Sequence, residues 1–233
     1  MSRGSAVRPN RLRFSRLLGP SVATFSFSRR QISLGNATSP SSSNVMQWIV
    51  FFSFATTRFS GVRIIIFNSA LMRQSCSALT PMADSADSIF FLDAARFRIV
   101  CVYVPAQPSH SKAFYKNLDV HLLDARHCLV LGDFNCVVDS RRDVREPGHG
   151  RSTWNAREFR RLIGHFDLVD CWTLLHGATF EHTWQRGRSS SRLDRVYVTE
   201  TLASAVQACG AVDFPPAIGH VSDHRPVLAK LSL

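Results

Sequence analysis

The first 83 residues of this 233-residue chain contain no aspartate and no glutamate. Ten of the 28 basic residues lie there, whereas all 17 acidic residues lie from Asp84 onward, so the N-terminal third carries nearly all of the net charge of +11. The remainder is almost neutral and has no global basic surface that would indicate nucleic-acid binding from composition alone. Because 45% of the residues are hydrophobic, a wholly disordered protein is excluded.

Cysteine pairs and long apolar runs are also missing. The six cysteines include no Cys-x-x-Cys pair, which is the usual spacing of zinc and redox sites. We therefore predict reduced thiols in the core and an intracellular protein. The longest apolar run, residues 45–55, is about half as long as a membrane-spanning helix. No membrane partner is expected, and no feature indicates an obligate protein partner.

Residues 1–43 are rich in arginine and serine and end in a Ser/Pro cluster, which predicts a disordered tail or leader. A mitochondrial leader is one interpretation, because transit peptides are rich in arginine and serine and poor in acids. An extension without a targeting signal is favoured, because the acid-free stretch continues well beyond any plausible cleavage point. Residues 44–233 are expected to form one folded domain.

Strand-length apolar runs alternate with helical patterns in residues 44–233. Phe114, Leu118 and Leu122 recur every four positions and predict a helix over residues 111–126, and a second helix is expected over residues 153–166. The predicted strands are residues 45–54, 62–67, 88–92, 97–104, 127–131, 180–185, 192–199 and 226–233, with a charged loop at 139–151. This order indicates α/β layers with a mixed sheet or two packed sheets.

Three short segments at predicted strand ends carry side chains suited to phosphate chemistry. They are Gly132-Asp133-Phe134-Asn135, Ser191-Arg192-Leu193-Asp194-Arg195 and Ser222-Asp223-His224-Arg225. Hydrolysis of a phosphodiester needs an oriented water, a group that accepts its proton, and positive charge near the developing oxyanion. Carboxylates with Mg²⁺, asparagine and histidine supply these. Each segment alone is equally typical of a turn or a helix cap.

Together and in this order, the segments resemble the endonuclease/exonuclease/phosphatase superfamily, which includes deoxyribonuclease I, and in particular the endonuclease domain of LINE-type (non-LTR) retrotransposons. The resemblance extends over residues 45–233. It is carried by CVYVPAQPSHSKAFYKNL, LVLGDFNCVVD, FEHTWQRGRSSSRLDRVYV and HVSDHRPVL. It implies a deoxyribonuclease I-like fold, which is a layered α/β sandwich of two packed mixed β-sheets flanked by helices.

The resemblance also implies roles for single residues near the first segment. Asp133 and Asn135 would orient the attacking water and the phosphate, with Asp133 as the candidate general base. Tyr103 would donate a hydrogen bond to the scissile phosphate.

Three further residues complete the implied site. Asp194 would bind or orient the site, and His224 would stabilise the transition-state oxyanion. Asp223 would either hold His224 or bind the divalent metal ion, Mg²⁺ or Mn²⁺. A histidine beside a carboxylate retains its proton more readily, so it can donate to a developing negative charge.

DNA is the expected partner. Trp184, Arg186 and Arg192 would stack on or clamp a nucleic-acid strand. A solvated arginine-rich hairpin explains the same residues equally well.

The sequence departs from the family pattern at its start. The superfamily begins with a strand that carries an asparagine, and a later strand ends in a metal-binding glutamate. Neither is recognisable here, and no acid precedes Asp84. This implies a domain that is incomplete at its N-terminal strands and a weakly bound metal ion.

Three functions are compatible with these features. The first is metal-dependent phosphodiester hydrolysis by a DNA-nicking endonuclease of the retrotransposon type, impaired by the absent glutamate and expected in the nucleus. The second is a catalytically inactive relic that at most binds nucleic acid. The third is a phosphatase for lipid or small phosphoesters, which the arginine-rich segment at residues 186–195 disfavours.

Overall fold

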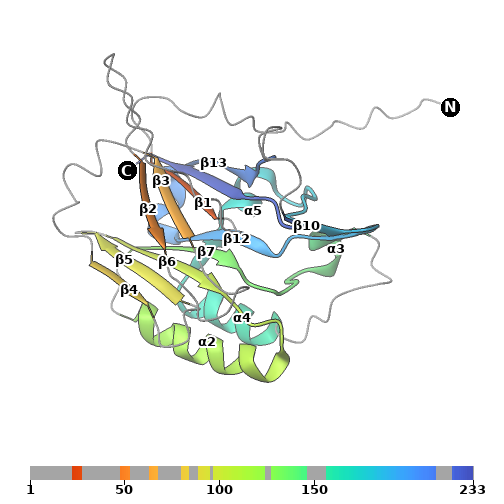
Figure 1. The fold of residues 1–233 in the computed structure, drawn as a ribbon, viewed down its shortest axis with the longest axis horizontal. Coiled ribbons are helices and arrows are strands. Elements are labelled where there is room, and N and C mark those ends of the chain that lie inside the picture. Colours follow the sequence, from red (N-terminus) through yellow and green to blue (C-terminus); the bar gives the residue numbers. More distant parts are fainter. Residues whose placement is uncertain are drawn as a thin grey trace, which may run out of the picture.

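Two β-sheets pack against one another in the computed structural model, and helices cover the outer face of the larger sheet (Figure 1). The structure describes residues 23–27, 48–52, 63–67, 80–83, 89–94, 97–123, 127–145, 156–213 and 222–232. Within these residues, no helix combines the length and the apolar character needed to cross a membrane.

The larger sheet has six strands in the order β4-β5-β6-β7-β12-β9. Their bounds are Thr80–Ala83 (β4), Ile89–Ala94 (β5), Phe97–Tyr103 (β6), Cys128–Asp133 (β7), Asp194–Thr199 (β12) and Leu168–Asp170 (β9). Strands β6 and β7 are parallel and all the other neighbours are antiparallel, so this sheet is mixed, as expected. The parallel pair is connected by a helix, as parallel pairing requires.

The smaller sheet has five strands in the order β13-β14-β1-β3-β2 and is antiparallel throughout, not mixed. Its strands are Val206–Ala211 (β13), Val227–Leu231 (β14), Ala23–Phe27 (β1), Arg63–Phe67 (β3) and Trp48–Phe52 (β2). Strand β1 corrects the expectation that all of residues 1–43 form a disordered tail. It alternates apolar and hydroxyl side chains, the period-two pattern of a strand. The rest of that tail lies outside the described residues.

A short three-stranded sheet and five helical segments complete the described fold. The strands, in the order β10-β11-β8, are Trp184–Arg186 (β10), Ser189–Ser191 (β11) and Val144–Arg145 (β8). The helices are Pro108–Leu122 (α2), Ser140–Asp143 (α3), Ala156–His165 (α4) and Cys171–His176 (α5), with a 3-10 helix at Glu200–Ala205. Helix α2 begins three residues earlier than predicted, because a proline fits the first helical turn. Helix α3 and strand β8 lie within the expected loop at 139–151.

Side chains of the larger sheet alternate between two cores. On β6, Ile99 and Cys101 pack toward the smaller sheet, whereas Val100 and Val102 pack toward α2 and α4. These four residues are at most 2% exposed, so both cores exclude bulk solvent at β6. Each buried aliphatic side chain contributes about 1.5–3 kcal/mol, so both faces of the sheet are strongly fixed.

The five cysteines that the structure describes are buried thiols, in line with the predicted core positions. Burial raises the pKa of Cys136 to about 11, so its thiol is protonated at neutral pH. Cys76 lies outside the described residues.

Gly132 allows β6 and β7 to approach closely just before the polar segment that follows β7. Its φ is +141°, and a Cβ atom built on it would lie 1.9 Å from the carbonyl oxygen of Val102. No side chain fits there without moving the backbone of β6.

We expect Gly132→Ala to lower the free energy of unfolding by about 3 kcal/mol or more, because it adds both backbone strain and a steric clash. Gly164→Ala is the matched control, since a Cβ there meets no atom within 4 Å. A change of about 1 kcal/mol or less is expected for this control. Chemical denaturation measures both, and equal effects of the two substitutions would contradict the close approach of β6 and β7.

Candidate active site

Three predicted site residues lie in one row across the larger sheet. Tyr103 at the end of β6 is the register partner of Asp133 at the end of β7, and Asp133 is the register partner of Asp194 at the start of β12. Each is two residues from a side chain that faces the smaller sheet, and side chains two apart on a strand share a face. The two carboxylates are nearly inaccessible, at 0% and 2% exposed.

His224 reaches this row from the segment before β14, on the other sheet. Its Nδ1 lies 2.8 Å from Asp194 Oδ2 and its Nε2 lies 3.9 Å from Asp133 Oδ2. A carboxylate accepts hydrogen bonds only, so Nδ1 is the donor in the shorter contact. Asp194 therefore fixes the orientation of the imidazole and directs Nε2 toward Asp133. The longer contact exceeds a hydrogen bond.

A tight turn after β7 fixes the Asp133 carboxylate. The backbone N–H of Asn135 donates to Oδ1 at 2.9 Å, and the Asn135 side-chain amide donates to Oδ2 at 3.2 Å and to the carbonyl oxygen of Val104 at 2.8 Å. Asn135 has φ of 44°, in the left-handed region that asparagine tolerates better than most residues. The turn thus places the Asn135 amide beside the Asp133 carboxylate.

Asp223 does not hold His224; the structure gives that role to Asp194. The Asp223 side chain is exposed and accepts a hydrogen bond from Trp184 Nε1 at 3.1 Å. The alternative role of Asp223, as a metal ligand, stays a prediction.

Arg192 and Trp184 do not lie on an open surface, which corrects their predicted contact with a nucleic-acid strand. Trp184 is 7% exposed and Arg192 is 2% exposed. Arg192 instead contacts Asp143 and Asp170 inside the protein. Arg186 is exposed on the β10–β11 hairpin and remains available to a partner.

Buried Asp143 and partly exposed Asp170, both near the site, remain ionised through their arginine partners. Burial alone would raise the pKa of Asp143, but Arg195 and Arg192 hold that pKa well below its usual range. The pKa of Asp170 is also lowered, because Arg192 and Arg195 outweigh the effect of burial.

Thr183 is a site residue that sequence reasoning missed. It is 2% exposed, and its Oγ1 accepts hydrogen bonds from the backbone N–H groups of Leu193 (3.0 Å) and Asp194 (2.9 Å). A single threonine before a tryptophan has no distinctive local pattern, so no signal in the sequence identified it. Its hydroxyl fixes the backbone at the start of β12.

The residues at this site fit a divalent cation. Asp133, Asp194 and His224 each offer a ligand atom, and these atoms all lie within 4.8 Å of one another. Asp194 Oδ1 is buried and has no hydrogen-bond partner, which is costly for a carboxylate oxygen unless something else binds it. Carboxylate oxygens are the ligands that Mg²⁺ and Mn²⁺ prefer.

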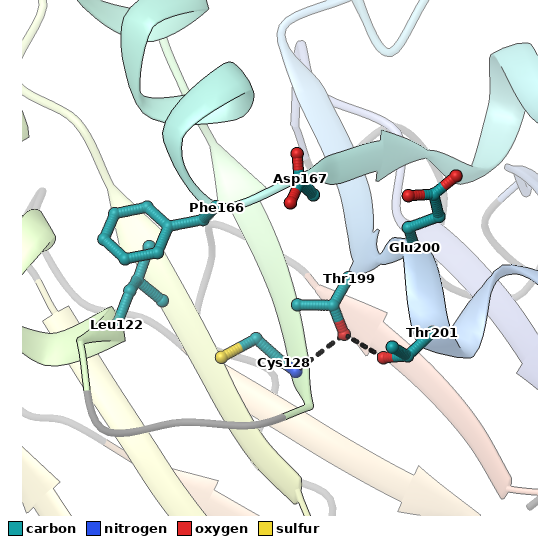
Figure 2. Close-up of a pocket in the computed structure, with 7 residues that line it drawn as sticks. All are labelled: Leu122, Cys128, Phe166, Asp167, Thr199, Glu200 and Thr201. Atoms are coloured by element: carbon teal, nitrogen blue, oxygen red, sulfur yellow. Dashed lines mark hydrogen bonds between the residues drawn. The ribbon is translucent and has the colours of Figure 1, made fainter.

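A separate pocket of about 220 Å³ lies at the other end of β7 and β12 (Figure 2). It is lined by Leu122, Cys128, Phe166, Asp167, Thr199, Glu200 and Thr201. Cys128 begins β7 and Thr199 ends β12, whereas Asp133 and Asp194 occupy the opposite ends of these strands. The pocket therefore contains none of the residues predicted for phosphate chemistry.

Residues 47–224 match the model of the endonuclease/exonuclease/phosphatase family. A relative from transposon TX1 of Xenopus laevis, described as an uncharacterized 149 kDa protein, is 28% identical over 192 residues. The match covers 79% of this chain and 14% of that protein, so the chain spans only a small part of its length.

Solved structures of DNA-processing enzymes share the fold. An AP endonuclease from Archaeoglobus fulgidus aligns with a TM-score of 0.65 at 17% identity over 80% of each chain. The 3′–5′ exonuclease NExo from Neisseria meningitidis aligns with a TM-score of 0.64 at 18% identity, also over 80% of each chain. The two-sheet α/β architecture predicted from the sequence is thereby confirmed.

We expect the free energy of unfolding to decline progressively as the pH falls below about 5, where aspartates of the unfolded chain begin to protonate. The pKa values of Asp143 and Asp170 are lower in the folded state than in the unfolded chain, so the unfolded chain takes up protons first and stability is lost on acidification. Asp143→Asn should be about 3–5 kcal/mol less stable at neutral pH and should show a shallower decline. The control Asp167→Asn, at an exposed position, should follow the wild type in denaturation experiments at each pH. If the stability of Asp143→Asn falls with pH as steeply as that of the wild type, the role of Asp143 is contradicted.

Proposed function

The chain belongs to the endonuclease/exonuclease/phosphatase family, and we propose that it hydrolyses phosphodiester bonds in DNA as a metal-dependent, nicking endonuclease of the retrotransposon type. The observation that carries the proposal is the convergence of Tyr103, Asp133, Asp194 and His224 at one end of the larger sheet. Such a function would be exercised in the nucleus.

The geometry supports a division of roles between the two ends of the His224 ring. Asp194 binds Nδ1 and favours the protonated imidazole, so Nε2 would donate to an oxyanion of the scissile phosphate. Asp133 Oδ2 lies 3.9 Å from Nε2, so a water bound between them could accept from Nε2 and donate to the carboxylate. Asp133 would accept the proton of the attacking water, with Asn135 orienting the water and Tyr103 donating to the phosphate.

Asp133 and Asp194 would hold the divalent cation, and Asp223 is a further candidate ligand. When bound, the cation would neutralise charge on the phosphate and lower the pKa of a bound water. Asp194 Oδ1 supports this assignment, because it is a buried carboxylate oxygen without a hydrogen-bond partner. No acid precedes Asp84, so the family's glutamate ligand has no counterpart there and we propose weak binding.

DNA is favoured over small phosphoesters by charge beside the site. Arg186 and Arg188 are exposed on either side of the Gly187 turn in the β10–β11 hairpin. The base of this hairpin is joined to the His224 segment, since Gln185 N–H donates to the Asp223 carbonyl oxygen at 2.9 Å. Two guanidinium groups here would contact phosphates that flank the scissile bond.

A catalytically inactive DNA-binding protein is the second candidate function. It is favoured by the absence of any carboxylate in the first 83 residues, which leaves fewer hard ligands for the metal ion. Cleavage measurements separate the two candidates directly.

With Mg²⁺ or Mn²⁺, the wild-type protein should convert supercoiled plasmid to the open-circular form, and EDTA should stop the reaction. His224→Ala and Asp133→Asn should lower the nicking rate by about 100-fold or more, because each removes a group that acts in the transition state. His110→Ala, at an exposed position on α2, is the matched control and should retain full activity. The same residual rate in the wild type and in His224→Ala would favour the inactive protein.

Arg186→Ala combined with Arg188→Ala should weaken duplex binding and reduce the slope of log K against log salt by about two, since two phosphate contacts are lost. Lys112→Ala combined with Lys116→Ala removes the same charge from an exposed part of α2 and is the matched control. Fluorescence anisotropy with EDTA present measures both doubly substituted proteins. Identical salt slopes for the two would show that the hairpin does not contact DNA.

A further inference from the structure

Four charged side chains form a network beside Asp194. Arg195 contacts Asp143 at 2.7 Å and Asp170 at 3.3 Å, and Arg192 contacts the same two carboxylates at 3.1 and 2.7 Å. The Asp170 side chain is 11% exposed, and the other three are between 0 and 3% exposed. At the edge of the network Arg142, whose side chain is 21% exposed, also contacts Asp143 at 3.2 Å.

Stability alone does not account for this network. Charged groups lose their hydration when they are buried, and their mutual attraction roughly offsets that loss, so apolar side chains of similar volume would stabilise the fold at least as well. Each arginine, however, presents a rigid planar fork that two carboxylates can satisfy in few arrangements. What the network provides is therefore a defined geometry.

The network joins the segments that surround the site. Asp143 ends α3, which follows the turn that contains Asp133 and Asn135. Asp170 ends β9 and also accepts hydrogen bonds from the first backbone N–H groups of α5. Arg192 lies two residues before the start of β12 and Arg195 is the second residue of that strand, so three chain segments meet at one point.

Arg192 and Arg195 flank Asp194 on both sides. The Arg192 backbone N–H donates to the Asp143 carbonyl oxygen at 2.9 Å, and the Arg195 guanidinium donates to the Arg192 carbonyl oxygen at 2.9 Å. The backbone that carries Asp194 is thus tied to the network immediately before and after it. Asp194 in turn binds His224 Nδ1 at 2.8 Å, a distance that tolerates little displacement.

We propose that Asp143, Asp170, Arg192 and Arg195 are positioning residues that fix Asp194 and, through it, the direction in which the His224 imidazole points. The proposal rests on the proposed function only in that His224 acts on a phosphate; the position of the imidazole can be measured without cleavage.

Nitrogen-15 and proton NMR of the histidine side chains tests the proposal. In the wild type, the His224 Nδ1 proton should give a downfield resonance protected from solvent exchange, assigned by its absence in His224→Gln. In Asp143→Asn this resonance should be lost or broadened. Leu118→Ala is the matched control, because it removes a fully buried side chain from the core under α2 and should retain the resonance. A folded Asp143→Asn protein with an unchanged resonance would overturn the proposal.

Arg192→Lys provides a second variant in case Asp143→Asn does not fold. It retains the charge and removes the fork, so loss or broadening of the same resonance supports the proposal and an unchanged resonance overturns it. If the wild type nicks DNA, Arg192→Lys should lower kcat about 10- to 100-fold at unchanged KM, whereas Leu118→Ala should retain kcat. A wild type that does not nick DNA would contradict the proposed function, and the NMR result would still decide the positioning role.

Discussion

The site depends on the register with which β6 and β12 pair on the two sides of β7. This register places Tyr103, Asp133 and Asp194 in one row and on one face. A slip of one residue would turn a carboxylate toward the helices, because successive side chains of a strand point to opposite faces. The two-sided apolar pattern of these strands prevents such a slip, and His224 then joins the row from the smaller sheet.

Charge near the row is arranged in two different ways. In the network of Asp143, Asp170, Arg192 and Arg195, each carboxylate is paired with both guanidinium groups, and Arg142 adds a further contact to Asp143. Asp133 and Asp194, by contrast, place two carboxylates beside a single imidazole. A bound cation would reduce the repulsion between these carboxylates and a phosphodiester.

Residues with strong local patterns were predicted well from the sequence, and residues defined by distant partners were not. The apolar runs predicted β6, β7 and β14 within about two residues, and the polar segments after them identified Asp133 and His224. The burial of Arg192 depends on partners 22 and 49 residues away, which no local pattern reveals. Asp223 was one candidate to hold His224, the other role being a metal ligand, whereas the folded chain supplies Asp194 from another sheet.

A crystal structure with a short DNA duplex and a divalent cation that does not support cleavage tests the central claim most directly. The account predicts one backbone phosphate at the row of Tyr103, Asp133 and Asp194, with a phosphate oxygen within hydrogen-bond distance of His224 Nε2. A duplex bound elsewhere on the protein, with no phosphate at His224, would contradict it.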